Sequence, residues 1–420
     1  MNIWVINATE PLPIDGARGR LLRSGILCNE LVRRGHDVTW WASTFHHARK
    51  FQRFEETKIL HPSERLKLVC LKGRVYEKHV SVGRLLNHIE TGYRFYNLAK
   101  NEVRPDIILC SYPLIELALA ATKLGKRWNV PVILDIRDLW PDIFEEQFNG
   151  WKKLFSVPVM FPFSWAARLS CRRAHGITGI TPGLMDWGVK KAGRLATAHD
   201  RSFPHGYFRS DFSAGEQESA EVFWAERGIH STDFIVSYFG AVNSRHEFDL
   251  VVEAGRLLSR RVKNLKIVIC GNGDHLDRIR DLSQDVPGVI APGWIAHLEM
   301  EVLASMATLG LAPYKSDFNY LESVPTKAIE YFSHGLPVVS SLKGRLEALL
   351  EAEHCGVTYE NGSPESLAQT IVDLAADPER VREMRGNSLR LFEERYDARS
   401  VYGDMAQYLA EQVRDAGSDR

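Results

Sequence analysis

Residues 321–340 read Leu-Glu-Ser-Val-Pro-Thr-Lys-Ala-Ile-Glu-Tyr-Phe-Ser-His-Gly-Leu-Pro-Val-Val-Ser. Pro325 suits the first turn of a helix, and Gly335 suits the position that ends one. Pro337 then opens a short β-branched run of the kind that forms a strand. The stretch therefore predicts a loop, a short helix and a strand in succession, which is a repeating unit of α/β folds with parallel strands.

Charged side chains stand at both ends of the predicted helix. Glu322 is expected in the loop and Glu330 in the helix. The backbone amides near Ser323 and Val324 are expected to point toward an anion at the helix N-terminus. Lys327 falls in the first turns, where the helix dipole disfavours a cation unless a negative ligand is nearby. A bound diphosphate would supply that negative charge.

The alternation of short apolar runs and longer helical patterns extends along the whole chain. It predicts an α/β fold of two Rossmann-like domains, because the pattern starts again after the turn-rich Pro204-His-Gly206. The polar segment 213–220 is expected to serve as the linker. The expected parts are a first domain at 1–210, a second at 211–395, and a C-terminal helix at 396–420 that returns to the first.

The spacing Glu-x7-Glu, followed by Gly335-Leu-Pro-Val338, resembles the signature of glycosyltransferase family 4, the large retaining family of the GT-B fold. The resemblance covers nearly the whole chain, since further matches lie at Gly35-His-Asp-Val38, Thr181-Pro-Gly183, Pro204-His-Gly206 and Gly293-Trp-Ile295. It implies an acceptor domain and a donor domain that face each other across a cleft. In this family the residue matched by Glu322 contacts the donor hexose, and the residue matched by Glu330 binds the ribose hydroxyls. Two solvated glutamates on a surface helix are the alternative.

Other donor contacts follow from the same resemblance. Trp294 and Ile295 match donor-binding positions. The family usually places an arginine directly after the glycine that ends the first strand of the donor domain, whereas here Gly240 is followed by alanine. Arg245 and Lys327 are therefore the nearest candidates to neutralise the donor diphosphate.

The block Asp135-Ile-Arg-Asp-Leu-Trp-Pro-Asp142, together with Ala42-Ser-Thr-Phe-His46, looks like a bacterial subgroup that makes O-antigen or capsular polysaccharide and often handles N-acetyl amino sugars. Many family members carry a histidine where Arg137 stands, beside the acidic residue matched by Asp138. That histidine contacts the donor sugar, so Arg137 and Asp138 are the catalytic candidates of the first domain.

The loop from Pro11 to Arg20 lies between the first expected strand and the first expected helix, where a doubly wound sheet places its ligands. Gly16 in this loop would let the backbone approach a phosphate closely. A plain strand-to-helix turn is the alternative, because Gly16-x-x-Gly19 is not the dinucleotide-binding fingerprint.

Composition limits the possible partners. The chain of 420 residues carries 53 basic and 53 acidic residues, so its formal charge is zero and a nucleic-acid partner is not expected. Six scattered cysteines indicate a reducing compartment. The N-terminus shows no signal peptide and no apolar stretch is long enough to cross a membrane, so a cytoplasmic location is expected.

The reaction expected from the resemblance is sugar transfer from a nucleotide-sugar donor, with UDP as the family-weighted nucleotide. The sequence contains no Asp-x-Asp motif, so neither a metal nor another cofactor is expected, and cations with helix-terminal amides would stabilise the leaving group. Two alternatives stay open, a non-catalytic GT-B-like binding or scaffold subunit and a nucleotide-sugar 2-epimerase. A metal site at the adjacent His46 and His47 is disfavoured, because such histidines are usually solvated.

The acceptor is expected to be a glycan or a polyprenyl-diphosphate-linked sugar on the cytoplasmic membrane face. The segment from Trp151 to Arg173 mixes aromatic residues with cations, as membrane-interface segments do. An ordinary helix pair packed on the sheet is the alternative, with Pro158 and Pro162 breaking any single long helix.

Overall fold

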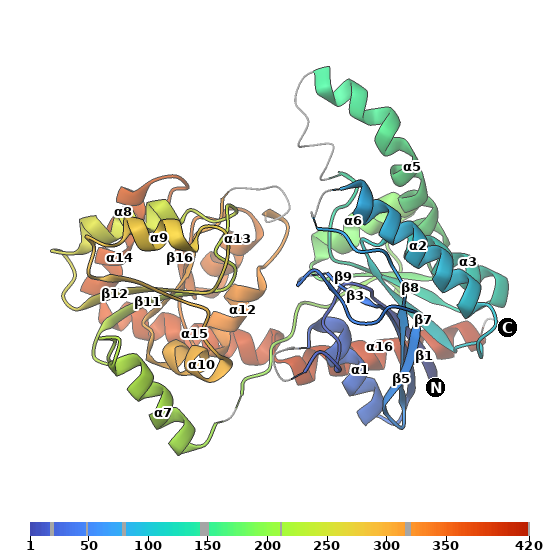
Figure 1. Cartoon of the computed structure of the whole chain (residues 1–420), viewed down its shortest axis with the longest axis horizontal. Coiled ribbons are helices and arrows are strands. Elements are labelled where there is room, and N and C mark those ends of the chain that lie inside the picture. Colours follow the sequence, from blue (N-terminus) through green and yellow to red (C-terminus); the bar gives the residue numbers. More distant parts are fainter. Residues whose placement is uncertain are drawn as a thin grey trace. The chain divides into compact units, whose positions relative to one another are not determined.

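The computed structural model describes residues 1–16, 21–47, 49–77, 81–142, 151–210, 212–315 and 321–418, with residues 151–159 and 418 described by their backbone alone. Contacts divide the chain into two compact units (Figure 1). Unit 1 comprises residues 1–205 and 398–420, and unit 2 comprises residues 206–397. The sequence had placed these boundaries at 210/211 and 395/396.

Unit 1 is built on an eight-stranded sheet in the order β10-β9-β8-β7-β1-β2-β6-β5. All neighbouring strands are parallel except β5, which pairs antiparallel with β6 at the edge. The central strands are largely apolar because helices cover both faces of the sheet, whereas the edge strands β5 and β10 are more polar and exposed. The strands are β1 (Asn2–Ile6), β2 (Asp37–Ser43), β5 (Lys58–Ser63), β6 (Leu66–Leu71), β7 (Ile107–Tyr112), β8 (Val132–Ile136), β9 (Gly176–Gly179) and β10 (Arg201–Ser202).

Two hydrophobic cores flank this sheet, one on each face. One core receives side chains from four helices, α2 (Val82–Ala99), α3 (Ile115–Trp128), α5 (Trp151–Arg173) and α6 (Pro182–Ala192). The other core receives them from α1 (Arg23–Arg33) and α16 (Ala398–Ser418), so the C-terminal helix packs on the first unit. A small hairpin of β3 (Phe45–His46) and β4 (Phe51–Gln52) completes the described elements of unit 1.

Unit 2 has a six-stranded, wholly parallel sheet in the order β13-β12-β11-β14-β15-β16. Its strands are β11 (Phe234–Phe239), β12 (Leu265–Cys270), β13 (Val289–Gly293), β14 (Leu309–Ala312), β15 (Val338–Ser340) and β16 (Gly356–Thr358). One face is covered by α8 (Phe248–Leu258), α9 (Leu276–Leu282) and α14 (Pro364–Ala376). The other is covered by α7 (Ala214–Ala225), α10 (His297–Met306), α12 (Thr326–Ser333), α13 (Arg345–Glu353) and α15 (Pro378–Arg395).

The expectation of a linker at 213–220 was wrong, because this segment opens helix α7. The Ser213 hydroxyl accepts a hydrogen bond from the Glu216 amide, and the Glu216 carboxylate accepts one from the Ser213 amide. Trp224, further along the helix, is fully buried. A reciprocal cap and one apolar face therefore make a helix from a segment whose composition is that of a linker.

The two prolines do not break α5, contrary to expectation. Residues 151–173 form one helix through Pro158 and Pro162. Its second half is anchored by the buried side chains of Ala167 and Cys171 in the core of unit 1. A proline removes one backbone donor and bends a helix, and tertiary packing of the flanking turns can keep the helix continuous.

Loss of the Ser213 cap should lower the stability of unit 2. We expect Ser213→Ala to lower the free energy of unfolding by about 1 kcal/mol, since the helix loses one of its few satisfied terminal amides. Urea denaturation followed by circular dichroism measures this change. Ser231→Ala, in an exposed turn, is the matched control, and an equal effect of both variants would show that the cap contributes nothing.

Candidate active site

The strand order of unit 2 contains a topological switch point between β11 and β14. β11 pairs with β12 on one side and with β14 on the other, so the chain reverses its direction of winding between β11 and β14. In a parallel sheet all strand-to-helix loops lie at the carboxyl edge, and the crevice at such a switch point is where ligands bind. The loop that begins at Gly240 and the segment that leads to α12 both start there.

The glycines at this edge are required by backbone geometry. Gly240 has φ of 137° and Gly271 has φ of 144°, values that residues with a side chain rarely adopt. The Gly240 amide donates to the Cys270 carbonyl at 3.0 Å, and the Val242 amide donates to the Asn272 carbonyl at 2.9 Å. A side-chain carbon on Gly271 would overlap the Gly240 carbonyl. The loops after β11 and β12 are therefore joined into one rigid surface.

Lys327 reaches this surface from helix α12. Its side chain is buried, its Nζ donates a hydrogen bond to the Phe239 carbonyl, and the ammonium lies 3.6 Å from the centre of the Tyr238 ring. Burial lowers the pKa of Lys327 to about 7, although the nearby Glu330 opposes this shift. A side-chain carbon on Gly240 would come within 2.5 Å of Nζ. The side-chain nitrogen of Lys327, a residue of α12, therefore lies at the carboxyl end of β11.

A buried, neutral histidine, His246, lies in the loop after β11, close to Lys327. His246 is buried, and burial together with Lys327 and Arg245 lowers its pKa to about 3. Its Nε2 lies 3.3 Å from the Tyr238 hydroxyl. Arg245 is exposed, and its carbonyl accepts a hydrogen bond from the Lys315 amide at 2.9 Å, which ties the loop after β11 to the loop after β14.

The remaining donor-side candidates lie on loops of the same edge. Glu322, Ser323 and Val324 are half-buried in the segment before α12, and Glu330 is half-buried in the helix. The helix begins at Thr326, so Ser323 and Val324 precede its first turn and the terminal helical amides begin later than expected. Directly after β13, Trp294 has 61% of its surface exposed and Ile295 is half-buried.

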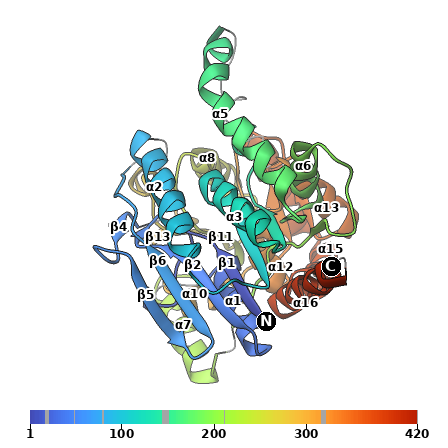
Figure 2. The same ribbon diagram turned by 90° about the vertical axis from the view of Figure 1, so that its right-hand side faces the viewer.

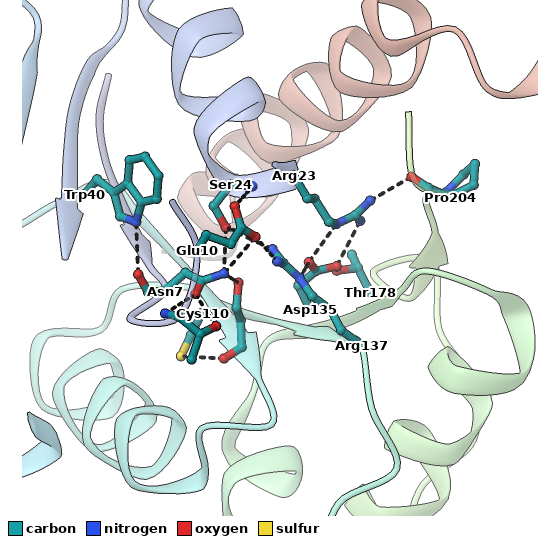
Figure 3. Close-up of polar contacts among 12 residues, drawn as sticks. Asn7, Glu10, Arg23, Ser24, Trp40, Cys110, Asp135, Arg137, Thr178 and Pro204 are labelled. Carbon is teal, nitrogen blue, oxygen red and sulfur yellow. Dashed lines mark hydrogen bonds and ion pairs between the residues drawn. The ribbon is translucent and has the colours of Figure 1, made fainter. Parts of the chain in front are cut away.

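Unit 1 carries a buried charge network at the carboxyl ends of its central strands (Figure 3). The Asp135 carboxylate accepts hydrogen bonds from Arg23 at 2.9 and 3.0 Å, from Arg137 at 2.8 Å and from the Thr178 hydroxyl at 2.9 Å. Burial alone would raise the pKa of Asp135, but the two guanidinium groups outweigh it and hold the pKa well below its usual range. Arg23 also donates to the Pro204 carbonyl at 2.7 Å.

Arg137 occupies the middle of this network. Its Nη1 is paired with Glu10, and its Nη2 donates to the Ser24 hydroxyl at 3.0 Å. Glu10 in turn accepts a hydrogen bond from the Ser24 amide at 2.8 Å, in the first turn of α1. The side chain of Arg137 is 14% exposed. Each nitrogen of its guanidinium therefore has a protein acceptor, which favours a role in positioning neighbouring groups.

Comparison with known proteins agrees with this architecture. The family description "Glycosyl transferase 4-like domain" matches residues 23–198, and "Glycosyl transferases group 1" matches residues 221–390. The chain belongs to the GT-B glycosyltransferases. No curated protein sequence matches it.

Solved structures of low sequence identity share the whole GT-B fold. Sucrose-phosphate synthase from Thermosynechococcus elongatus has a TM-score of 0.71 at 17% identity, over 99% of both chains. HepE from Anabaena, in complex with UDP, has a TM-score of 0.66 at 14% identity, over 98% of this chain and 100% of that one. WaaG, a glycosyltransferase involved in lipopolysaccharide biosynthesis, has a TM-score of 0.65 at 14% identity, over 97% of this chain and 99% of that one.

Two predicted site residues of unit 1 remain, Asp138 and Gly16, and one histidine, His205, belongs to the surroundings of the Asp135 network. The Asp138 carboxylate accepts a hydrogen bond from the Trp140 amide at 3.2 Å. Gly16 is exposed with φ of 81°, and the residues directly after it lie outside the described part of the chain. His205 lies near both guanidinium groups, and burial together with Arg23 lowers its pKa to about 3, so its imidazole is neutral.

Sequence reasoning missed Glu10, Arg23 and Asp135. Asp135 carried a usable signal, because it interrupts the apolar run Val132-Ile-Leu-Asp-Ile136 of a strand expected to be buried on both faces. Glu10 and Arg23 gave no such signal, since their ion pairs with Arg137 and Asp135 join residues more than one hundred positions apart. In the described residues, no three His, Cys, Asp or Glu side chains gather as a metal-binding group.

Removal of Asp135 should destabilise unit 1 strongly. We expect Asp135→Ala to lower the free energy of unfolding by about 3–5 kcal/mol, because two buried guanidinium groups lose their shared partner. Asp37→Ala is the control, since Asp37 forms an exposed pair with Arg65 at 3.1 Å and should contribute less than about 1 kcal/mol. Equal losses in urea denaturation would contradict the argument.

The titration of Lys327 should couple to nucleotide binding. Below a pH of about 7 the ammonium is charged and favours a diphosphate, so the affinity for UDP should fall as the pH rises through 7. Lys327→Met should bind UDP more weakly with little of this pH dependence, and Lys327→Arg should keep its charge and its affinity. Isothermal titration calorimetry between pH 6 and 9 measures this, with exposed Lys263→Met as the control.

A second readout tests the same lysine without ligand. The pKa of Lys327 is lower in the folded state than the ordinary value of 10.5, which means that burying the charged ammonium lowers the free energy of unfolding. This desolvation cost is fully present below a pH of about 7 and disappears as the pH rises from about 7 toward 10.5. Lys327→Met should therefore be relatively more stable near pH 6 than near pH 10. A stability difference independent of pH would show that Lys327 is not desolvated.

Proposed function

We propose that this chain is a retaining glycosyltransferase that moves a hexose or an N-acetylhexosamine from a UDP-linked donor to an acceptor of bacterial surface polysaccharide synthesis. The observation that carries the proposal is the Lys327 ammonium at the carboxyl end of β11, directly beside Gly240. A cation at a switch point, on a surface closed by glycine backbones, suits a diphosphate that leaves with growing negative charge. The Anabaena protein of the same fold, whose structures hold UDP and UDP-glucose, supports a UDP-linked donor.

The proposed roles on unit 2 divide between binding and chemistry. Lys327 and exposed Arg245 neutralise the diphosphate, and the first amides of α12 add donors. Glu330 binds the ribose hydroxyls, and Glu322 contacts the transferred sugar. Trp294 and Ile295 contact the nucleotide. These contacts act without a metal, because the cations and the amides supply the charge stabilisation that a divalent ion supplies elsewhere.

The proposed role of unit 1 is to hold the acceptor and to complete the catalytic site. Arg137 and Asp138 remain the catalytic candidates, with Arg137 held rigidly by Asp135 and Glu10. We propose a polyprenyl-diphosphate-linked glycan as the acceptor and the cytoplasmic face of the membrane as the location. None of the helices in the described part of the chain combines the length and the apolar character that a bilayer crossing requires.

A non-catalytic scaffold is the second candidate, and one observation favours it. Every nitrogen of the Arg137 guanidinium is engaged by Asp135, Glu10 or Ser24, at the position where many relatives carry a sugar-contacting histidine. Hydrolysis or transfer of a radiolabelled UDP-sugar by the purified chain separates the two candidates. A changed sugar released without any acceptor would instead indicate a 2-epimerase.

Two carboxylate variants test the proposed donor site. Glu330→Ala should weaken UDP binding by about 1.5–3 kcal/mol, since a charged hydrogen bond to the ribose is lost. Glu322→Ala should lower kcat more than it weakens UDP binding, because its contacts are at the reacting sugar. Calorimetry with UDP and steady-state assays of sugar transfer measure both, with exposed Glu218→Ala as the control. The opposite ranking would reverse the two roles, and two unchanged variants would remove the site from this helix.

A further inference from the structure

Two segments that are far apart in the sequence meet at one edge of unit 1. The loop that begins at Pro11 follows β1, and the block Ala42–His46 runs from β2 into β3. Asp15 of the loop contacts both His46 of the block and Arg53, which directly follows β4. Both segments follow the carboxyl ends of parallel strands, and Figure 2 shows β4 next to β6 at this edge of the sheet. We call Asp15, Arg53 and His46 the Arg53 cluster.

Arg53 ties the loop to the end of β2. Its Nε and Nη2 donate hydrogen bonds to the two carboxylate oxygens of Asp15 at 2.5 and 2.6 Å. Its Nη1 donates to the carbonyls of Ser43 and Phe45 at 3.1 and 3.2 Å. The side chains of Arg53 and Asp15 are 5% and 3% exposed. The buried guanidinium therefore uses each of its three nitrogens to hold one carboxylate against the backbone that leaves β2.

Asp15 also closes a turn of its own loop. The Leu12 amide donates to the Asp15 carboxylate at 2.7 Å, and the Asp15 amide donates to the Leu12 carbonyl at 2.9 Å. Burial alone would raise the pKa of Asp15, but the hydrogen bonds from Arg53 and Leu12 and the charge of Arg53 outweigh it and lower the pKa. The carboxylate is therefore ionised at neutral pH, and the turn has a defined geometry.

His46 supports the same carboxylate as a neutral group. Burial, together with Arg53, lowers the pKa of His46, although Asp15 opposes this shift. The Arg49 amide donates to its Nδ1 at 3.1 Å, so the proton of the neutral ring is assigned to Nε2, which faces the Asp15 carboxylate at 3.6 Å. The ring stacks on Phe51 with the ring centres 5.0 Å apart. The expectation of a solvated histidine was therefore wrong for His46, whose side chain is buried.

The loop is fixed at both ends by buried carboxylates. Glu10, at its start, pairs with Arg137, and Asp15, near its end, is held by Arg53. The strand that leads into the loop, β1, is flanked by β2 and β7, so the loop lies at the switch point of unit 1, where parallel sheets bind ligands. Apolar residues can often replace a buried ion pair without loss of stability, so stability alone does not account for this pair. Its directional bonds fix the geometry of the loop.

We propose that Arg53 is a positioning residue: through Asp15 it fixes the turn at residues 12–15 beside Arg137, so that unit 1 holds the acceptor hydroxyl, or a water in its place, for reaction. The inference rests on the proposed function, in which unit 1 holds the acceptor. A positioning role predicts that a loosened turn lowers turnover and leaves the binding of UDP to unit 2 unchanged. A purely structural role predicts a loss of stability without loss of turnover per folded molecule.

Unit 1 contains a matched ion pair at the opposite edge of the sheet. Arg194 bonds both carboxylate oxygens of buried Asp200, with its Nη2 at 2.7 Å from Oδ1. Asp200 also accepts a hydrogen bond from the Ile177 amide at 2.9 Å, near the amino end of β9. Both pairs thus join a bidentate arginine to a buried carboxylate that accepts from a backbone amide. D15L with R53M removes the first pair, and D200L with R194M removes the second as the control.

Turnover is measured as the release of UDP from UDP-glucose and from UDP-N-acetylglucosamine, with water in the place of the acceptor. Calorimetry with UDP and urea denaturation use the same preparations. D15L with R53M should lower kcat on the order of tenfold, since a displacement of about 1 Å near the reacting atoms can cost roughly a hundredfold. Its UDP affinity should stay unchanged, and D200L with R194M should keep both kcat and UDP affinity. Equal losses of kcat in the two double variants, or an unchanged kcat in the first, would overturn the inference. A parallel fall in UDP affinity in the first would also overturn it, because the turn would then serve the donor phosphate.

Hydrogen exchange tests the grip of Arg53 without any activity. R53K leaves Asp15 and its bond to the Leu12 amide in place, keeps a cation opposite the carboxylate, and removes the bidentate contact. A peptide that spans residues 8–16 should exchange roughly tenfold faster in R53K, about the effect of one lost hydrogen bond to a charged group. R194K, the control, should leave the exchange of this peptide unchanged.

R53K also serves where the double variant does not fold, and its kcat should fall in the same direction. An exchange rate equal to that of the wild type would show that Arg53 does not hold the turn. A wild type that hydrolyses neither donor, with the expected change of exchange in R53K, would overturn the proposed function and leave the grip of Arg53 on the turn in place. Hydrolysis by the wild type with unchanged exchange and unchanged kcat in R53K would overturn the positioning role alone.

Discussion

Parallel pairing of strands constrains where this chain can place chemistry. Because every strand of unit 2 is parallel to its neighbours, all strand-to-helix loops lie at one edge, and the winding reverses there between β11 and β14, the place where folds of this kind bind ligands. Lys327 lies more than eighty positions after Gly240 and Arg245 in the sequence, and it meets the loop that carries them only because of that constraint. Unit 1 shows the same reversal, since β1 is flanked by β2 and β7. Asn7 directly follows β1, and its side-chain amide donates a hydrogen bond at 3.3 Å to the hydroxyl of Ser111 near the end of β7.

The two units treat buried charge in opposite ways. In unit 1, Asp135 is surrounded by two arginines and a hydroxyl, so its desolvation is compensated and its charge is fixed at every physiological pH. In unit 2, Lys327 is buried against a carbonyl and an aromatic ring, which compensate an ammonium only in part, and its pKa falls to about 7. A buried charge whose desolvation cost is offset by paired groups stabilises the surrounding fold. A buried charge with incomplete partners keeps part of that desolvation cost, and a bound anionic ligand can offset the remainder. This contrast is the physical reason to place ligand binding at Lys327 and a structural role at Asp135.

The sequence predicted most of the fold, because apolar runs, capping residues and glycines report local structure. The helix and the strand expected within residues 321–340 are α12 at Thr326–Ser333 and β15 at Val338–Ser340, and the C-terminal helix packs on unit 1 as expected. Local sequence patterns gave the wrong secondary structure where tertiary packing determines it. The segment expected as a linker at 213–220 opens helix α7, and α5 continues through two prolines that were expected to break it. The candidate site was predicted in part. Lys327 could be named from its motif, but its burial depends on Tyr238 and Phe239, nearly ninety residues away. Two of the three partners of Arg137, Glu10 and Ser24, likewise lie more than one hundred positions away, so no local pattern connects them.

Zero net charge makes the distribution of charge more informative than its sum. At physiological ionic strength, fields between exposed charges are largely screened beyond about 8 Å, so a neutral protein has little long-range attraction toward a membrane or a polyanion. Any association with an anionic surface must then come from direct contact by locally unpaired cations and by apolar side chains that enter the interface. In the described part of unit 1, exposed aromatic rings and exposed arginines occur together along the carboxyl half of α5, at Phe161, Trp165, Arg168 and Arg172. Because aromatic burial is insensitive to salt and cation binding is not, docking through this helix would weaken with added salt without vanishing.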